Sequence, residues 1–504
     1  MAQICVPICE LTFDAMKETA LRADRFADLI ELRLDGLTAM ELKQIGGKLE
    51  QLSSTLGRPV IMTLRPIEQG GGASLNLSER AEFFTRMQSA AMFDIELDLA
   101  TKLMSNGGDV EWSKIICSHH DFHRVPDDLD RIYERIAATP ARILKVAVHA
   151  NDIVDCVPVF NLLERAQTEG REMIGIAMGM PGLPTRILGP AFGGYLTYGS
   201  IDDGRQTASG QPTATHLSEL YRIGSINSHT RVTGLVGRPV SHSISPHIHN
   251  AAFASCGVNA VFIPLEVHDL RAFFRRMVNP ATREIPWNLQ GLSVTAPHKS
   301  AVIDLLDSVD AAAREIGAVN TVVIEGNKLL GYNTDASGFL RALKDKFGSL
   351  KRANCAIIGA GGASRAALWG LRSEGASTTL FARDLNKAAT VANSFASEVK
   401  PLKNARFDGF DVVVNATPLG THGALSGETA VVADQLAGTR LAYDMVYNPS
   451  ETLFLREARV AGCETLGGMT MLVNQAVEQF RLWTGIDAPF EVMKQAATTA
   501  LMNG

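Results

Sequence analysis

The sequence predicts an α/β protein of several domains, in which a (β/α)8 barrel precedes two further α/β units. Three observations support this prediction. The 504 residues exceed what one ordinary hydrophobic core supports, so two to four domains are expected. A hydrophobic content of 46%, a charged content of 20% and 44 glycines are typical of a soluble, glycine-rich α/β enzyme. Short apolar runs alternate with amphipathic, helix-like stretches along the first half.

Charge and composition exclude several function classes. A formal net charge of −6 gives no electrostatic reason to bind nucleic acid or an anionic membrane. No apolar run reaches the roughly 18 residues of a membrane-spanning helix. Residues 1–8 resemble a first strand rather than a targeting segment, so a cytoplasmic location is expected. The seven cysteines are scattered without C-x-x-C pairs, which favours reduced thiols over disulfides or a zinc site.

Strand-like runs separated by helix-like stretches recur throughout the first half of the chain. Eight such units between residues 4 and 198 fit the (β/α)8 barrel best. The runs are Ile4–Cys9, Asp28–Leu34, Val60–Leu64, Met92–Leu97, Lys114–Ser118, Ile143–Val148, Met173–Ala177 and Gly194–Tyr198.

Polar side chains mark the carboxyl ends of these strands, which form the active-site face of such a barrel. They are Glu31, Arg33, Arg65, His120, Lys145 and Arg186. Lys145 lies inside an apolar strand, where a lysine must either extend to the surface or lose its charge. We expect repulsion from the nearby arginines to hold Lys145 neutral, and a neutral amine attacks carbonyl carbons. The cluster therefore predicts a Schiff-base site for an anionic carbonyl substrate.

These residues belong to motifs that resemble type I 3-dehydroquinate dehydratases over residues 1–221. The motifs are Glu31–Asp35, Thr63–Pro66, Ser118–Phe122, Leu144-Lys145, Met178–Met180 with Arg186, and Ser209–Pro212. The resemblance implies that Lys145 forms an imine with the C3 ketone of 3-dehydroquinate. It implies that His120 removes a C2 proton and returns a proton to the departing C1 hydroxyl. It also implies that Arg186 binds the carboxylate bidentately.

The same resemblance implies that further side chains position the substrate. They are Glu31, Arg33, Arg65, Thr207, Ser209 and Gln211. Two departures from the family pattern fall near the expected lid loop. Gln69 stands near the place of a family glutamate, and Thr207 aligns with the family serine while Ser209 replaces a proline. His119, His120 and His123 could also form a metal cluster, but their spacing suits no known zinc pattern, so no metal is expected.

A domain boundary is predicted at residues 222–230, where small polar residues replace the helical pattern. A strand at 231–237 then begins a substrate-binding unit over residues 231–335, which a C-terminal helix at about 480–504 completes. Residues 336–479 form the third unit. Its strand at 355–358 runs into Gly359-Ala360-Gly361-Gly362-Ala363, a glycine turn at a helix start that predicts a Rossmann domain binding a pyrophosphate.

The next strand of that unit ends at Arg383, where an NAD-selective enzyme normally carries an acidic residue. An arginine favours the 2′-phosphate of NADP, although Asp384 could accept from a 2′-hydroxyl. In the preceding unit, Lys299 and Asp335 follow strands and could together exchange a proton with an alkoxide during hydride transfer. Either residue alone would more often be a surface charge.

These motifs resemble shikimate dehydrogenases over residues 231–504. They include Ser243–Asn250, Thr295–Lys299, Gly317–Thr321, Asn333–Asp335, Gly359–Ser364, Asn415–Pro418, Asp444–Tyr447 and Gly467–Met469. The resemblance implies that Lys299 and Asp335 act as a catalytic dyad. It implies that 3-dehydroshikimate is bound by Ser243, Ser245, Thr295, Asn320 and Gln475. The implied NADP(H) contacts are Gly359, Ala360, Gly361, Gly362, Ala363, Arg383, Asn415, Thr417 and Gly468.

Both resemblances together imply a fusion similar to the plant type. It would dehydrate 3-dehydroquinate and reduce the product, 3-dehydroshikimate, to shikimate with NADPH, as a monomer or weak homodimer. One alternative joins an imine-forming barrel to a quinate dehydrogenase, although the hydroxyls of Ser243 and Ser245 favour shikimate. A second alternative, a ligand-sensing module without activity, is disfavoured because Lys145, Lys299 and Asp335 are all present.

Overall fold

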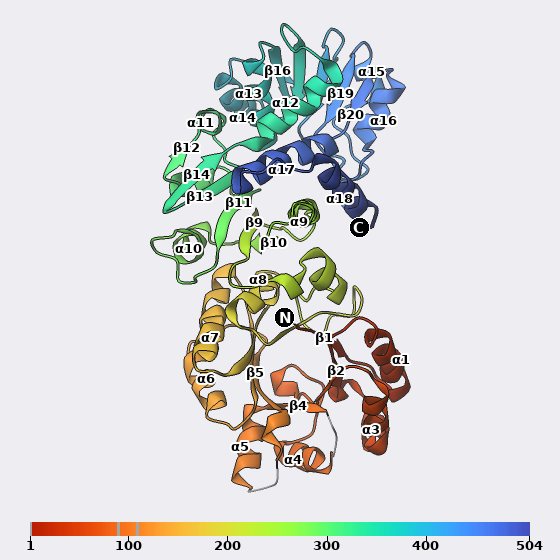
Figure 1. Ribbon diagram of the computed structural model, residues 1–504. Helices are drawn as coiled ribbons and strands as arrows, with labels where there is room; N and C mark the ends of the chain where they lie inside the picture. The colour runs from red at the N-terminus through yellow and green to blue at the C-terminus, as the bar shows by residue number, and fades with distance from the viewer. Residues whose placement is uncertain (1–2, 88–90, 107–109, 504) are drawn as a thin grey trace. The chain divides into compact units, whose positions relative to one another are not determined.

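The computed structural model describes residues 3–87, 91–106 and 110–503 (Figure 1). The chain divides into two compact units. The first comprises residues 1–232, 239–241 and 263–288, and the second comprises 233–238, 242–262 and 289–504. The linker expected at 222–230 lies inside the first unit, as does part of the expected substrate-binding domain. The domain limits drawn from the sequence therefore stay predictions. No helix in the described part of the chain is both long and apolar enough to cross a membrane.

The first unit contains a parallel eight-stranded sheet in the order β7-β6-β5-β4-β3-β2-β1-β8. The strands are β1 Gln3–Ile8, β2 Leu29–Arg33, β3 Val60–Thr63, β4 Met92–Glu96, β5 Ile115–Asp121, β6 Ile143–His149, β7 Glu172–Met178 and β8 Leu196–Tyr198. A bridge between Met173 and Gly194 brings the two edges together, which nearly closes the barrel. The eight predicted strands and the barrel are confirmed.

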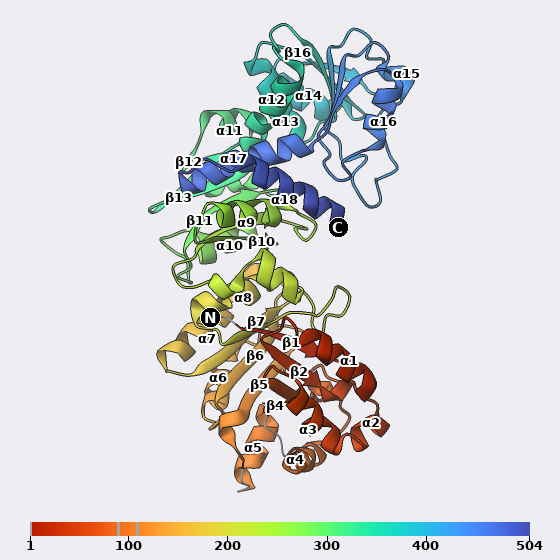
Figure 2. The same cartoon turned by 45° about the vertical axis from the view of Figure 1, so that its right-hand side comes forward.

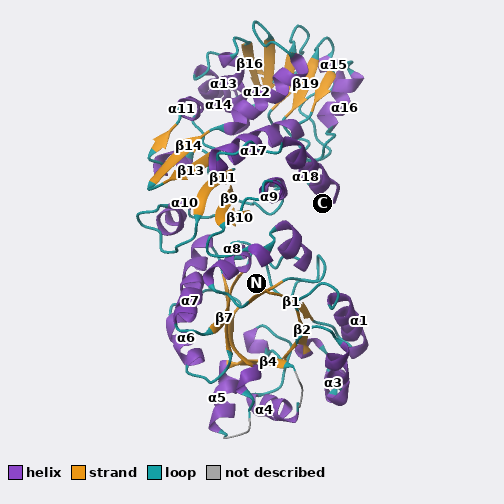
Figure 3. Ribbon diagram, in the orientation of Figure 1, coloured by secondary structure: helices purple, strands orange, loops and turns teal. Residues whose placement is uncertain are grey.

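Helices surround this ring of strands, as Figure 3 shows. They are α1 Phe13–Ala23, α2 Ala39–Lys43, α3 Gly46–Thr55, α4 Leu77–Arg86, α5 Leu97–Ser105, α6 Leu129–Ala137, α7 Cys156–Thr168 and α8 Leu183–Leu188. Side chains alternate between the two faces of a strand, so residues 143, 145 and 147 of β6 share one face. Ile143 and Ala147 belong to the apolar core of the barrel. Lys145 therefore points into the barrel interior.

The second unit contains most of a mixed sheet with the order β10-β9-β11-β13-β14-β12. Its strands are β9 Arg231–Gly237, β10 Ala260–Glu266, β11 Leu289–Val294, β12 Ser308–Val309, β13 Thr321–Glu325 and β14 Lys328–Tyr332. The associated helices are α9 Ser245–Ser255, α11 Ala311–Ile316, α17 Met469–Thr484 and α18 Phe490–Asn503, whereas α10 Leu270–Phe273 belongs to the first unit. Helix α17 packs against β11, β13 and α9, and α18 packs against α9 (Figure 2). The C-terminal helices thus return to this sheet.

The remaining sheet is parallel, with the order β17-β16-β15-β18-β19-β20. Its strands are β15 Asn354–Ile358, β16 Ser377–Ala382, β17 Glu398–Pro401, β18 Val412–Asn415, β19 Leu441–Asp444 and β20 Glu464–Leu466. Its helices are α12 Thr334–Phe347, α13 Gly362–Ser373, α14 Leu385–Asn393, α15 Ala433–Leu436 and α16 Leu453–Val460. Counted from β15, the order is 3-2-1-4-5-6, which is that of a Rossmann fold. The predicted fold is confirmed, and its switch point lies between β15 and β18.

Candidate active sites

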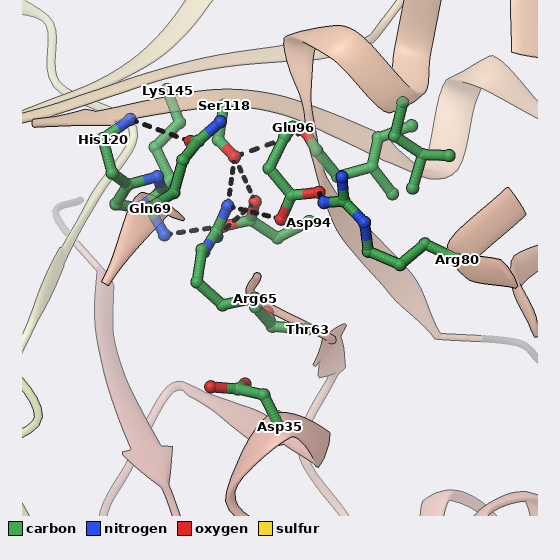
Figure 4. A network of polar contacts seen from close by, with 12 residues as sticks. Asp35, Thr63, Arg65, Gln69, Arg80, Asp94, Glu96, Ser118, His120 and Lys145 are labelled. Carbon is green, nitrogen blue, oxygen red and sulfur yellow. Dashed lines mark hydrogen bonds and ion pairs between the residues drawn. The ribbon is translucent and has the colours of Figure 1, made fainter. Parts of the chain in front are cut away.

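The first candidate site forms around Lys145, whose side chain is only 6% exposed. Its Nζ atom lies 2.7 Å from Asp94 Oδ2 (Figure 4). The same atom lies 2.9 Å from the hydroxyl of Tyr198. The second oxygen of Asp94 lies 2.7 Å from Arg65 Nη2. Asp94 therefore joins two cations inside the barrel.

This ion pair corrects the expectation that repulsion from arginines holds Lys145 neutral. Burial alone would raise the pKa of Asp94, but the charges of Arg65 and Lys145 outweigh burial and hold it well below its usual value. Asp94 is therefore an anion, and an anion at 2.7 Å favours a positively charged nitrogen on Lys145. Repulsion by the arginines is offset by a carboxylate that the sequence analysis did not identify.

Arg65 takes part in a wider buried network. Its Nη1 atom donates to Glu96 Oε1 at 3.0 Å and to Ser118 Oγ at 2.8 Å, in addition to its ion pair with Asp94. Arg80 donates to the other oxygen of Glu96 at 2.8 Å (Figure 4). Arg65 borders the pocket where we expected it to bind substrate, but its described contacts are with the protein. These contacts suit a residue that holds Asp94 and Glu96 in place.

One pocket above this network collects nearly all of the residues predicted for the first site. Those that line it are Glu31, Arg33, Arg65, His120, Lys145, Arg186, Thr207 and Gln211. Phe122, Ala147, Ile176, Met178, Tyr198 and Ala208 complete the wall. Ser209 is the exception, because it is exposed and does not line the pocket. Its backbone carbonyl accepts the amide of Gly179 at 3.0 Å, so it supports a neighbouring loop instead.

Arg33 and Arg186, the other two arginines of the pocket, differ in their partners. Arg33 makes two bonds to Asp35, at 2.9 and 2.7 Å, and is neutralised by them. Arg186 is 1% exposed, and its Nε atom has no hydrogen-bond partner among the described residues. Burial lowers the pKa of Arg186 to about 10. A buried guanidinium without an anion is costly, so this residue is suited to receive a carboxylate from a ligand.

His120 borders the same pocket at the end of β5. Burial, followed by the charges of Arg65 and Lys145, lowers the pKa of His120 well below its usual value. The ring is consequently neutral at pH 7 and can accept a proton. Its backbone N–H donates to Gln69 Oε1 at 3.1 Å, so Gln69 helps to hold the strand end. No group of three potential metal-binding side chains occurs within the part of the chain that the structure describes.

The second candidate site contains the ion pair between Lys299 Nζ and Asp335 Oδ2, at 2.5 Å. The side-chain nitrogen of Asn320 donates to the other oxygen of Asp335 at 2.8 Å. Its side-chain oxygen accepts a hydrogen bond from the backbone amide of Thr334 at 2.7 Å. Asn333 caps helix α12 by accepting the amide of Ala336 at 3.1 Å. The turn from β14 into α12 thereby fixes Asp335 opposite Lys299.

The other residues predicted to bind the second substrate have local contacts. Ser243 Oγ accepts the backbone amide of Ser245 at 3.2 Å, at the start of α9. The amide of Thr295, just after β11, donates to the carbonyl of Val236 at 2.8 Å. Gln475 on α17 donates to the carbonyl of Leu472, one turn earlier, at 2.9 Å. That these side chains meet around one ligand stays a prediction.

The glycine turn after β15 has the geometry of a phosphate-binding loop. Gly359 has a φ of +107°, a conformation that favours glycine. A Cβ atom added to Gly361 or Gly362 would meet nothing within 4 Å, so the turn is open at the start of α13. Ser364 Oγ braces it by donating to the carbonyl of Gly359 at 2.6 Å. The backbone between Gly359 and Ala363, which includes Ala360, therefore fits a pyrophosphate at a helix N-terminus.

Asn415 and Thr417 follow β18 and are joined by a hydrogen bond, and their expected contact with NADP(H) stays a prediction. Asn415 is fully buried, donates to Asp444 at 3.0 Å and accepts from the Thr417 hydroxyl at 2.7 Å. Its side chain therefore shapes the loop rather than projecting from it. Gly468 immediately precedes α17 as its N-cap residue. A Cβ atom added to Gly468 would lie 2.4 Å from the carbonyl oxygen of Met445. That close approach requires glycine.

Arg383 lies exposed just beyond the end of β16. It borders a hollow of about 800 Å³ that Lys403 and Arg406 also line. The carboxylate of Asp384 accepts the backbone amides of Asn386 and Lys387, each at 3.1 Å, and so caps helix α14. The carboxylate of Asp384 is therefore used in the helix cap. Arg383, Lys403 and Arg406 form a basic surface at the end of β16.

Comparisons with known proteins place both halves in families. Residues 4–228 match the type I 3-dehydroquinase family, and residues 235–322 match the shikimate dehydrogenase substrate binding domain. Residues 468–498 match the shikimate 5′-dehydrogenase C-terminal domain. The chloroplastic bifunctional 3-dehydroquinate dehydratase/shikimate dehydrogenase of Arabidopsis thaliana is 35% identical over 98% of this chain and 83% of its own length. The chain belongs to this bifunctional family.

Two further relatives agree with that membership. The shikimate biosynthesis protein AroDE of Chlamydia pneumoniae is 29% identical, with 95% of each chain aligned. A solved shikimate dehydrogenase in complex with NADP+ has 36% sequence identity, covers 55% of this chain and 97% of its own, and superimposes with a TM-score of 0.52. The bifunctional dehydratase–dehydrogenase family thus accounts for both the barrel and the second half.

We predict that Asp94 is essential to the stability of the dehydratase barrel. Removing one partner of a buried ion pair leaves an uncompensated charge and typically costs about 3–5 kcal/mol. Asp94→Asn should lower the free energy of unfolding of the barrel by about that amount, measured by urea denaturation. The matched control is Glu82→Gln, which breaks the exposed pair of Glu82 and Arg86 and should change stability by less than about 1 kcal/mol. Equal effects of the two variants would contradict the central position of Asp94.

Proposed function

We propose that Lys145 is the imine-forming nucleophile of the dehydratase half and that His120 is its acid–base partner. The supporting observation is the single pocket that holds Lys145, His120 and Arg186, whose guanidinium donates to the Tyr198 carbonyl at 3.5 Å but has no anionic partner among the described residues. Arg186 would bind the carboxylate of 3-dehydroquinate and so direct the ketone toward Lys145. The chain would then release 3-dehydroshikimate, which is the substrate of its second half.

The reaction steps follow from this arrangement. Neutral His120 first takes a proton from the Lys145 ammonium group, and the free amine attacks the C3 carbonyl to give a carbinolamine. His120 returns this proton to the carbinolamine hydroxyl, which leaves as water and gives an iminium ion. Neutral His120 removes a C2 proton, and the resulting enamine expels the C1 hydroxyl as water with a proton from His120. Hydrolysis of the imine frees 3-dehydroshikimate and the lysine. Asp94 stays beside a cationic nitrogen in both the ammonium and the iminium states, so it would stabilise the intermediate by the same ion pair.

In the second half, we propose that Lys299 and Asp335 carry the proton transfer in the reduction of 3-dehydroshikimate to shikimate. NADPH supplies the hydride when it is bound. Lys299, held by Asp335, would donate a proton to the developing alkoxide oxygen. The Gly359–Ala363 turn would hold the pyrophosphate, and Arg383 would bind the 2′-phosphate. The expected cytoplasmic location and the monomer or weak homodimer stay predictions.

We predict that borohydride traps the substrate on Lys145. Reduction of the iminium ion gives a stable secondary amine, so treatment with 3-dehydroquinate and borohydride should abolish dehydratase activity. Mass spectrometry of peptides should locate a ligand-sized addition on Lys145. Lys145→Ala should lose both the adduct and the dehydratase activity, while its reduction of supplied 3-dehydroshikimate continues. An active Lys145→Ala dehydratase would rule out the imine mechanism.

We also predict that Arg383 determines the preference for NADPH over NADH. Charge-assisted hydrogen bonds to a phosphate contribute roughly 1.5–3 kcal/mol each, so Arg383→Ala should raise the KM for NADPH about 10- to 100-fold. The KM for NADH should hardly change, because NADH lacks the 2′-phosphate. Arg372→Gln, in the last turn of α13, is the matched control and should change neither constant. A similar loss for both cofactors in Arg383→Ala would contradict the assignment.

A further inference from the structure

We propose that Gln479 is a positioning residue of the dehydrogenase half, which holds Asn320 and, through it, the Asp335 carboxylate that faces Lys299. The inference rests on the proposed role of the Lys299–Asp335 pair. Gln479 lies on α17, one turn after Gln475, and its side chain is fully buried. Helix α17 thus brings a buried amide from the C-terminal part of the chain to the strands that carry the site.

The amide nitrogen of Gln479 connects two neighbouring strands. It lies 3.1 Å from Ser293 Oγ on β11 and 3.0 Å from Thr321 Oγ1 on β13. It also lies 3.3 Å from the backbone carbonyl of Asn320. Ser293 and Thr321 are direct partners in the antiparallel ladder of β11 and β13. Gln479 therefore fixes the point at which β13 begins.

The hydrogen bonds continue from this point to the dyad. The side-chain oxygen of Asn320 accepts from Thr321 Oγ1 at 2.9 Å, and its amide nitrogen donates to Asp335 Oδ1 at 2.8 Å. The other oxygen of Asp335 binds Lys299. Gln479 thus reaches Asn320 by two routes, through its backbone carbonyl and through the Thr321 hydroxyl. Without Gln479, Asn320 would keep its contacts with Thr334 but lose both of these supports, so its donor to Asp335 would be less well placed.

The surroundings of Gln479 indicate that stability alone does not explain this residue. Its Oε1 atom and both ring nitrogens of His249 have no hydrogen-bond partner of ordinary geometry among the described residues. His249 is fully buried and stacks on Phe262, with ring centroids 4.4 Å apart. Burial lowers the pKa of His249 to about 3, although the nearby Gln479 acts in the opposite direction. The side chains of His249 and Gln479 are therefore both uncharged at neutral pH.

The oxygen of Gln479 is poorly partnered, which is costly for a buried polar atom, whereas its nitrogen serves three oxygen atoms of residues 293, 320 and 321. Local violations of this kind are expected where function, rather than stability, selects the residue. The amide nitrogen of Gln479 donates to Ser293 on β11 and to residues 320 and 321, where β13 begins. This is the segment that supports Asp335. We therefore assign the cost of the unpaired oxygen to the positioning of the dyad.

Gln479→Leu and Gln479→Met test the proposal with apolar side chains of similar size. A misplacement of about 1 Å costs on the order of 100-fold in rate, so we expect kcat for 3-dehydroshikimate reduction to fall about 10- to 100-fold. The KM for NADPH should stay within about 3-fold of wild type, because the cofactor turn is untouched. Stability in urea should fall by no more than about 3 kcal/mol, because Ser293 Oγ and Thr321 Oγ1 lose this donor, and the protein should stay folded in the assay. Arg481→Gln, exposed on the same helix, is the matched control and should leave kcat unchanged.

Gln479→Glu adds a readout that a merely structural residue would not affect. This variant keeps the shape but replaces the amide donor by a carboxylate at the start of the hydrogen-bond path through Asn320 to Asp335. An added negative charge favours the protonated forms of both dyad members, so the pH profile of kcat should move to higher pH. An unchanged profile together with an unchanged kcat would overturn the proposal.

A double-mutant cycle separates failure of this inference from failure of the proposed dyad. If Gln479 acts through Asp335, the loss in Gln479→Leu/Asp335→Asn should be close to that of Asp335→Asn alone. Losses that multiply fully would show that Gln479 acts independently, and a wild-type kcat in both apolar variants would also overturn the proposal. A wild-type kcat in Lys299→Ala and Asp335→Asn would instead contradict the proposed function itself.

Discussion

The buried ion pair between Lys145 and Asp94 is the constraint on which the dehydratase half depends. A lone ammonium group inside a barrel would cost several kcal/mol, so its place in the core requires a carboxylate beside it. Asp94 supplies that carboxylate, and Arg65 holds its second oxygen at 2.7 Å. Glu96 and Arg80 then balance Arg65 in turn. This alternation explains how the interior can hold Lys145, Asp94 and Arg65 as charged groups, while burial raises the pKa of Glu96 to about 7.

This balance leaves Arg186 as the cation that lacks an anionic partner among the described pocket residues. Arg33 and Arg65 are committed to carboxylates of the protein, whereas Arg186 faces the pocket without one. The two lysine sites also differ in a way that suits their chemistry. The Lys145 side chain is 6% exposed, and that of Lys299 is 29% exposed. An imine needs a site that limits contact with water, whereas a proton donor must recover its proton from solvent.

Much of the architecture could be predicted because it depends on local patterns. The alternation of side chains in Ile143–His149 directs Lys145 into the barrel, and the turn at Gly359 identifies the first strand of the Rossmann sheet. Asp94 was missed because Phe93-Asp94-Ile95-Glu96 alternates like any strand with one solvated face. Only the closure of the barrel shows that its polar face points inward.

Contacts between distant residues account for the other differences. The contacts of Arg65 with Glu96 and Ser118 join positions far apart in the chain, so they could not be predicted, and its role in substrate binding stays a prediction. Ser209 falls outside the pocket because its loop turns its backbone toward Gly179. Gln479 lies 158 positions from Thr321, so nothing near it in the sequence indicates its role.

The most direct test of the account is the product formed from 3-dehydroquinate and NADPH by the purified chain alone. The account predicts shikimate, with one NADPH oxidised for each molecule formed, because the two halves catalyse consecutive steps. Accumulation of 3-dehydroshikimate without oxidation of NADPH would contradict the reductase assignment. Unchanged 3-dehydroquinate, in a sample that still reduces supplied 3-dehydroshikimate, would contradict the dehydratase assignment.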